Sequence, residues 1–159
     1  MLFNIAVTIL TFIAMEGVAW CTHKYVMHGL LWNLHEDHHK KNPSSFFEKN
    51  DYFFLIFALP GMSALGIGTF YAPLHGLMFI GIGITLYGFA YFLIHDIFIH
   101  QRFKWLRNSN NAYFRAIRKA HKMHHKHLEK EDGEGFGMLW VPLKYYKEAL
   151  KQNKTANAG

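Results

Sequence analysis

Three long apolar blocks limit the folds open to this sequence. They cover residues 1–22, 52–72 and 74–94, and Glu16 carries the only charge in any of them. An α-helix of about 20 residues is about 30 Å long, which matches the hydrocarbon core of a bilayer. Because little more than Pro73 separates the second block from the third, the sequence predicts a single span followed by a tight transmembrane hairpin.

The composition agrees with a membrane protein of one domain. Of the 159 residues, 51% are hydrophobic and only 18% are charged, against about 25% charged in a typical soluble domain. We expect residues 1–150 to form one membrane-embedded domain and residues 151–159 to form a polar, frayed tail. Glycines inside the second and third blocks suit close helix packing in lipid; they are Gly61, Gly66, Gly68, Gly81, Gly83 and Gly88.

The basic residues predict the orientation in the membrane. All 17 Lys and Arg lie within 24–49, within 102–130 or from Lys144 onwards. By the positive-inside rule, the span ends beside these stretches face the cytoplasm, and the N-terminus and the hairpin tip lie outside. Because the basic stretches alternate with membrane-length blocks, the net charge of +6 does not indicate nucleic-acid binding. The single Cys21 excludes a CxxC metal or redox site, and a short re-entrant element near 136–143 remains open.

Twelve histidines are the most unusual feature of the sequence, and ten of them form a pattern that occurs twice. Each copy has an H-x4-H pair and then an H-x2-H-H motif, and each begins where a predicted span reaches the cytoplasm. The hairpin between the copies leads out and back, so all ten imidazoles are expected on one side of the membrane. The first copy comprises His23, His28, His35, His38 and His39, and the second comprises His95, His100, His121, His124 and His125.

The spacings predict how these rings point. On an α-helix, positions i, i+3 and i+4 fall within a wedge of about 100°, so each H-x2-H-H motif is expected to present three imidazoles to one point. Positions i and i+5 diverge by about 140°. Each H-x4-H pair therefore needs a kink, a π-bulge or a helix end between its histidines. His75 at the hairpin tip and His127 beyond the last motif are expected to take no part.

Ten converging imidazoles without a thiolate indicate metal chemistry. Neutral imidazole suits iron, zinc, copper and nickel, and a structural zinc site is complete with four ligands. The ten histidines therefore imply either two metal ions with four or five ligands each or a smaller site with many spectator histidines. Ligating histidines usually donate their other ring N–H to a carboxylate or a carbonyl, and Glu16, Asp37 and Asp96 are the candidate carboxylates.

At these motifs the chain resembles a known family. The segments HKYVMHG (23–29), HEDHH (35–39), HDIFIHQR (95–102) and HKMHH (121–125) are similar to those of the bacterial β-carotene hydroxylases. These are integral-membrane, non-haem di-iron enzymes of the fatty acid hydroxylase superfamily, and the likeness runs from Glu16 to about Pro142. Together with the apolar blocks, it implies an all-α integral membrane protein with about three transmembrane helices and cytoplasmic helices that form a histidine-rich metal-binding cap.

The resemblance also implies an activity. The reaction would be hydroxylation of the β-ionone rings of β-carotene at C3 and C3′, which gives β-cryptoxanthin and zeaxanthin. It would use two irons, O2 as co-substrate, a carotenoid taken from the bilayer and a ferredoxin-type electron donor, in the inner membrane of a bacterium. Trp20, Phe92 and Phe98 are candidates for lining the route of the carotenoid ring, and the basic stretch from Arg102 to Lys130 is expected to bind an acidic electron carrier or lipid headgroups.

Other functions stay open at this point. A related fatty acyl or sterol hydroxylase or desaturase, or a carotenoid ketolase, would use similar histidine motifs. His35-Glu36-Asp37-His38-His39 also reads as H-E-x-x-H, the zinc motif of metalloproteases, although that interpretation leaves eight of the ten histidines unused. A metal transporter would place its site near the membrane midplane, whereas these histidines gather at one interface.

Overall fold

The chain folds into helices arranged as three long spans and a cap. A computed structural model describes residues 1–40, 45–103, 105, 109–131 and 133–156, and within these ranges it contains helices and no strand. The three spans are continuous helices long and apolar enough to cross a membrane, over Leu2–Leu30, Lys49–Phe70 and Gly76–Ile99. The predicted all-helical membrane fold is therefore confirmed.

Two of the spans change their helix type where they reach the cap. Helix α1 (Leu2–Cys21) continues as the π-helix η1 (Thr22–Leu30), and α4 (Gly76–Tyr91) continues as the π-helix η4 (Phe92–Ile99). The remaining elements are the 3₁₀ turn η2 (Lys49–Asp51), α3 (Tyr52–Phe70), the 3₁₀ turn η3 (Ala72–Leu74), and the cap helices α2 (Trp32–His39), α5 (Ala112–His124) and α6 (Leu143–Ala156).

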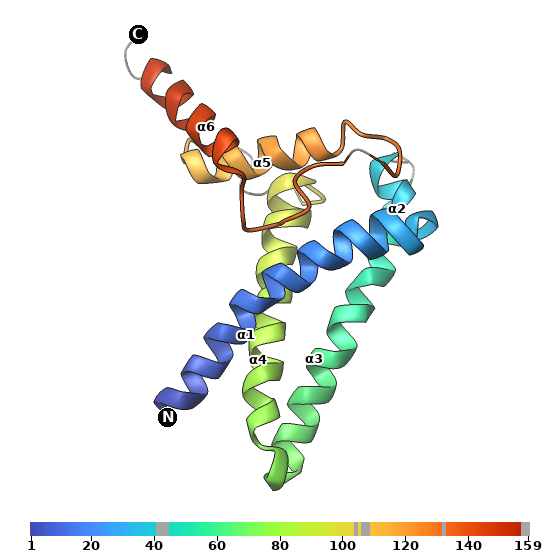
Figure 1. The fold of residues 1–159 in the computed structure, drawn as a ribbon, viewed down its shortest axis with the longest axis vertical. Coiled ribbons are helices and arrows are strands. Elements are labelled where there is room, and N and C mark those ends of the chain that lie inside the picture. The colour runs from blue at the N-terminus through green and yellow to red at the C-terminus, as the bar shows by residue number, and fades with distance from the viewer. Residues whose placement is uncertain (41–44, 104, 106–108, 132, 157–159) are drawn as a thin grey trace.

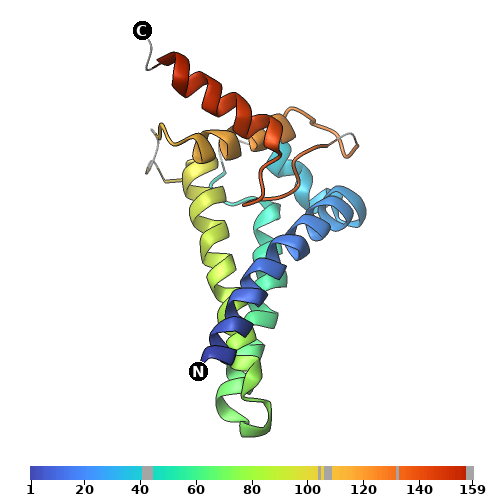
Figure 2. The same cartoon turned by 60° about the vertical axis from the view of Figure 1, so that its left-hand side comes forward.

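The spans all lead to one cap. Helices α3 and α4 form the predicted hairpin, with η3 at its tip, and α1 packs against α4. Figure 1 shows α2, α5 and α6 at the end of the spans opposite this tip, and in Figure 2 the N-terminus again lies toward the hairpin end. Both histidine repeats thus reach the same end of the molecule, as predicted.

Close helix contact depends on two glycines in particular. A Cβ at Gly81 would lie 2.6 Å from the backbone nitrogen of Leu65, and a Cβ at Gly83 would lie 2.6 Å from Cβ of Thr11. Gly61 and Gly68 are similarly crowded across the hairpin. The packing prediction was wrong for Gly66 and Gly88, where an added Cβ would meet no atom within 4 Å, so these two positions face open space.

Helix α6 extends further than expected. Residues beyond 150, predicted as a frayed tail, continue the helix to Ala156. The physical reason lies in α5, because Arg115 donates hydrogen bonds to the side chains of Gln152, at 2.8 Å, and Asn153. The apolar contact between α5 and α6 is built from Ala116, Ala120, Tyr145 and Ala149.

The chain between α5 and α6 is irregular and is tied to the first span. Its residues 136–142 form no helix, so the re-entrant element that the sequence left open is an irregular segment with bends at Met138 and Leu139. Glu16 Oε1 accepts the backbone N–H groups of Met138, Leu139 and Trp140 at 2.8–2.9 Å, and Glu16 Oε2 accepts from Tyr87 OH at 2.8 Å. One carboxylate on α1 therefore anchors both this segment and α4.

Candidate metal centre

The π-helices bring each H-x4-H pair together. In a π-helix the backbone hydrogen bond joins residue i to residue i+5, and the N–H of His100 donates to the carbonyl of His95 at 2.9 Å. The ring centroids of these two histidines are 4.4 Å apart, and those of His23 and His28 are 5.2 Å apart. Of the three geometries that the spacing allowed, the chain uses the π-helix.

All ten histidines of the two repeats gather in the cap and form two neighbouring clusters. The first cluster is His23, His28, His35, His39 and His124, with one ligand atom from each within 4.8 Å of the others. The second contains His38, His95, His100 and His121 at the same spacing, and His125 adjoins it with Nε2 2.8 Å from Nε2 of His121. The other two histidines belong to neither cluster. His75 lies at the hairpin tip, where its Nδ1 contacts the carbonyl of Gly68. His127 takes part only through its backbone carbonyl, which accepts from His39 Nδ1.

The two repeats exchange one histidine. His38 belongs to the first repeat but lies in the second cluster, and His124 belongs to the second repeat but lies in the first. The prediction that each H-x2-H-H motif presents three rings to one point was therefore wrong. Positions i+3 and i+4 lie about 100° apart around the helix axis, on either side of position i. The two rings at these positions can therefore point to different metal sites.

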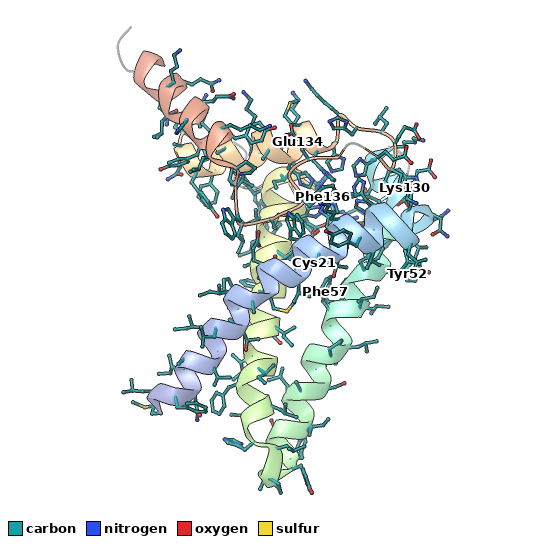
Figure 3. All side chains as sticks on the ribbon, in the orientation of Figure 1. Cys21, Tyr52, Phe57, Lys130, Glu134 and Phe136 are labelled. Atoms are coloured by element: carbon teal, nitrogen blue, oxygen red, sulfur yellow. The ribbon has the colours of Figure 1, made fainter. Side chains whose placement is uncertain are left out.

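In the first cluster, every ring has its outer nitrogen satisfied by a neutral oxygen. His35 Nδ1 donates to Asn50 Oδ1 at 2.6 Å, and the other four donate to backbone carbonyls of the segment after α5. These bonds join His23 to Phe136 at 3.0 Å, His28 to Lys130 at 3.1 Å, His39 to His127 at 2.8 Å and His124 to Glu134 at 2.9 Å. In Figure 3, ring nitrogens gather where the segment carrying Lys130, Glu134 and Phe136 passes over the cap.

These hydrogen bonds leave the Nε2 atoms facing one another. Nε2 of His23 lies 3.2 Å from Nε2 of His35, and Nε2 of His28 lies 3.2 Å from Nε2 of His124. His39 Nε2 is buried and has no hydrogen-bond partner among the described residues. Ligating histidines have this arrangement, with the outer nitrogen fixed by an oxygen and the inner one free for a metal, so the residues fit a metal ion.

Carboxylates contact the Nδ1 atoms of two rings in the second cluster. Glu48 Oε2 accepts from His38 Nδ1 at 2.6 Å, and Asp96 Oδ2 lies 3.4 Å from His95 Nδ1. Asp96 is thus where the sequence analysis expected it. The other two candidate carboxylates have different partners, because Asp37 accepts the backbone N–H of Lys49 at 2.5 Å and Glu16 holds the segment at 138–140.

Sequence reasoning missed Glu48 and Asn50. Both lie between the first histidine repeat and α3, in a stretch without hydrophobic periodicity. A usable signal was the short polar run Glu48-Lys49-Asn50-Asp51 directly before an apolar span. Carbonyl partners such as that of His127 leave no sequence signal, because every residue has a carbonyl.

Six cluster histidines outside the spans have a lowered pKa and are neutral at pH 7. Burial, reinforced for most of these rings by neighbouring imidazoles, lowers the pKa of His35 to about 3, that of His39 to about 4 and those of His124 and His125 to about 2. Burial also holds the pKa of His38 and of His121 well below the ordinary value. Metal binding requires the deprotonated imidazole, so at pH 7 no proton has to leave these rings first.

An apolar cavity of about 110 Å³ lies between the three spans and reaches both clusters. Its walls include Met15 and Ala19 of α1, Phe57 of α3 and Tyr87 of α4, and it ends at His23 of the first cluster and His95 of the second. Phe92, one of the aromatic candidates from the sequence, lines this cavity.

The other two aromatic candidates, Trp20 and Phe98, do not line this cavity. Trp20 lies in a separate groove against Phe136 and Trp140. Phe98 is buried, and its ring packs under the guanidinium of Arg118 at 4.2 Å. Both point away from the cavity because the spacing of residues at a span end does not fix which side of the helix faces the neighbouring spans.

Comparisons with known proteins identify relatives of this chain. The chain is 40% identical over 143 residues to the β-carotene hydroxylase of Pseudescherichia vulneris, covering 89% of this chain and 78% of the relative. It is 34% identical over 159 residues to the β-carotene hydroxylase of Pantoea ananas, covering 99% and 89%. It is also 39% identical over 132 residues to the chloroplastic β-carotene hydroxylase 2 of Capsicum annuum, covering 82% and 42%.

No solved structure matches the chain. The model of the fatty acid hydroxylase family matches residues 8–143, which include all ten clustered histidines, the whole of the second and third spans, and the first span from residue 8 onwards. The chain belongs to the fatty acid hydroxylase family.

Proposed function

We propose that this protein is a membrane di-iron monooxygenase that hydroxylates the β-ionone rings of β-carotene at C3 and C3′. The products are β-cryptoxanthin and then zeaxanthin. One observation gives the proposal its main support. The apolar cavity between the spans is lined by one histidine from each of the two clusters that could hold a metal ion. The choice of β-carotene as substrate comes from the names of the β-carotene hydroxylase relatives.

The ten histidines hold the metal in this account. Five rings would hold each of two irons, and the outer hydrogen bonds of the first cluster and of His38 favour the tautomer that presents Nε2. Iron is the metal because oxidation of an unactivated C–H bond with O2 needs a redox-active ion, and zinc is redox-inert. When bound, the two irons supply the activation of O2.

The chain's other residues position the substrate. β-Carotene dissolves in the hydrocarbon of the bilayer, so its ring can move from lipid into the cavity without crossing water. Phe57 and Met15 surround the ring with apolar surface, and Tyr87 closes another wall. This lining excludes water and keeps the target carbon beside the histidine clusters, which is the protein's part in a reaction whose chemistry belongs to the metal.

The reaction needs an electron donor. Each hydroxylation puts one oxygen atom of O2 on the ring and releases the other as water, which consumes two electrons and two protons. We take the donor to be a ferredoxin-type protein, bound through its acidic surface. The end of helix α5 supports this choice, because the helix carries His121 and His124 on its buried side and the exposed Lys122 on its outer side, and the exposed Lys126 lies in the turn that follows.

The bacterial relatives and the basic residues suggest the location. We place the protein in the inner membrane of a bacterium, with the histidine clusters on the cytoplasmic side and the N-terminus outside. The cap carries the basic residues of α5 and α6, and the hairpin tip carries none, in agreement with the positive-inside rule.

Expression in a bacterium that accumulates β-carotene tests the proposal. Chromatography and mass analysis of the pigments should find products heavier by one and two oxygen atoms that co-elute with β-cryptoxanthin and zeaxanthin. His38→Ala at equal abundance in the membrane is the matched control and should give neither product. Unchanged β-carotene in the presence of the protein and a working ferredoxin system would contradict the proposed substrate.

A further inference from the structure

The two histidine clusters differ in the oxygen atoms behind their rings, although repeated motifs build both. In the first cluster, all five outer hydrogen bonds go to neutral oxygens, four of them carbonyls and one the amide of Asn50. In the second, His38 donates to the carboxylate of Glu48 and His95 contacts that of Asp96. The rings that would bind the metal are imidazoles in both clusters.

Arg102 fixes the carboxylates behind the second cluster. Its guanidinium lies 3.6 Å from Glu48, 2.7 Å from Asp51 and 3.4 Å from Asp96. Three carboxylates therefore meet at one guanidinium. The side chain of Glu48 is only 10% exposed, so water screens its charge weakly.

The bond from His38 to Glu48 is a charge-assisted hydrogen bond because its acceptor is a carboxylate. It measures 2.6 Å between Nδ1 and Oε2, and such bonds are about twice as strong as neutral ones. A carboxylate acceptor pulls on the Nδ1–H proton and raises the basicity of the ring as a metal ligand. An amide acceptor, as in the pair of His35 and Asn50, does so less.

We propose that Glu48 is a positioning residue that makes the two metal sites inequivalent. Through His38 it makes the second cluster the tighter iron site and the one that favours iron(III), whereas the first cluster, held by neutral oxygens, favours iron(II). This inference rests on the di-iron centre proposed above but not on its substrate.

Two reciprocal substitutions test it. Glu48→Gln keeps an oxygen within reach of His38 but removes the negative charge, and Asn50→Asp places a carboxylate behind His35 in the first cluster. Both are measured on the full chain in detergent, loaded anaerobically with iron-57, by competition with a chelator and by Mössbauer spectroscopy. Circular dichroism checks that each variant is folded.

The wild type should give two distinct iron signals of equal area. Glu48→Gln should weaken one of the two irons by about 10- to 100-fold, the usual effect of losing such a hydrogen-bond partner, and should move only one signal. Asn50→Asp should tighten the other iron and move the other signal. If Glu48→Gln does not fold, the Asn50→Asp result decides.

Two identical irons in the wild type, or equal effects of either substitution on both irons, would overturn the inference. A chain that binds two inequivalent irons and shifts as expected, yet leaves β-carotene unchanged, would support the inference and contradict the proposed substrate. The two proposals can therefore fail separately.

Discussion

His38 and His124 occupy the same place in the two histidine repeats, and each lies in the cluster that the other repeat builds. Neither repeat therefore completes a cluster by itself. The exchange joins α2 to η4 through Nε2 of His38 and Nε2 of His95, 3.1 Å apart, and joins α5 to η1 through Nε2 of His124 and Nε2 of His28, 3.2 Å apart. The two sites and the ends of two spans thus form one unit.

The exchange of His38 and His124 between the clusters predicts which iron each alanine substitution should affect. His38→Ala should selectively weaken iron in the second cluster, and His124→Ala should selectively weaken iron in the first, because each removes a ring from the cluster of the other repeat. Either change should reduce zeaxanthin formation below detection. Iron content and pigment analysis on the same membranes measure both effects.

His75→Ala and His127→Ala are the controls for these variants. His75 lies at the hairpin tip, and His127 contributes a carbonyl that alanine retains. Both variants should keep most of the activity and both irons. Substantial turnover by His38→Ala or His124→Ala at normal abundance would contradict the assignment of two metals.

Much of this arrangement could be predicted from the sequence. The apolar blocks and the basic stretches predicted the three spans and the common end of all ten histidines, because span length and chain direction are local properties. The spacing of His95 and His100 predicted a departure from the α-helix, and a π-helix is present. The assignment of each ring to a cluster could not be predicted, since it depends on how η4 and α5 approach each other.

Filling the cavity should block the substrate. Gly88 lines the cavity, and a Cβ there would meet no protein atom within 4 Å. Gly88→Leu should therefore leave the fold stable and lower the rate of ring hydroxylation by about tenfold or more, because small displacements of a reacting group are costly. Pigment time courses and iron content measure the two effects.

Gly66→Leu is the matched control for Gly88→Leu. Gly66 is equally free of neighbours but does not line the cavity, so this variant should hydroxylate at the normal rate. Equal rates for the two variants would show that the ring does not bind in this cavity.

Glu16 should contribute to stability. Glu16→Ala leaves three backbone N–H groups and the hydroxyl of Tyr87 without their acceptor, which should cost about 3 kcal/mol of unfolding free energy or more. Glu16→Gln keeps one oxygen to accept from the three backbone N–H groups, and its NH2 can donate to the Tyr87 hydroxyl oxygen, so it should cost less. Thermal unfolding in detergent compares the two, and equal melting temperatures for both variants would exclude this anchoring role.

Charge reversal at the end of α5 and in the turn after it should weaken the association with the electron donor. In the double variant Lys122→Glu and Lys126→Glu, kcat/KM for a reduced acidic ferredoxin should fall about tenfold at low ionic strength and less at high salt, because charged surfaces mainly guide encounter. Single turnover of the chemically reduced protein should stay normal. An unchanged kcat/KM with ferredoxin, together with weaker binding to anionic vesicles, would assign these lysines to lipid headgroups instead.

Isotope-labelled oxygen tests the central claim most directly. The purified chain, loaded with iron and supplied with β-carotene, a ferredoxin system and ¹⁸O2, should yield β-cryptoxanthin and zeaxanthin in which every hydroxyl carries ¹⁸O. No product, or hydroxyl oxygen that comes from water, would contradict the account of this protein as a di-iron carotenoid monooxygenase.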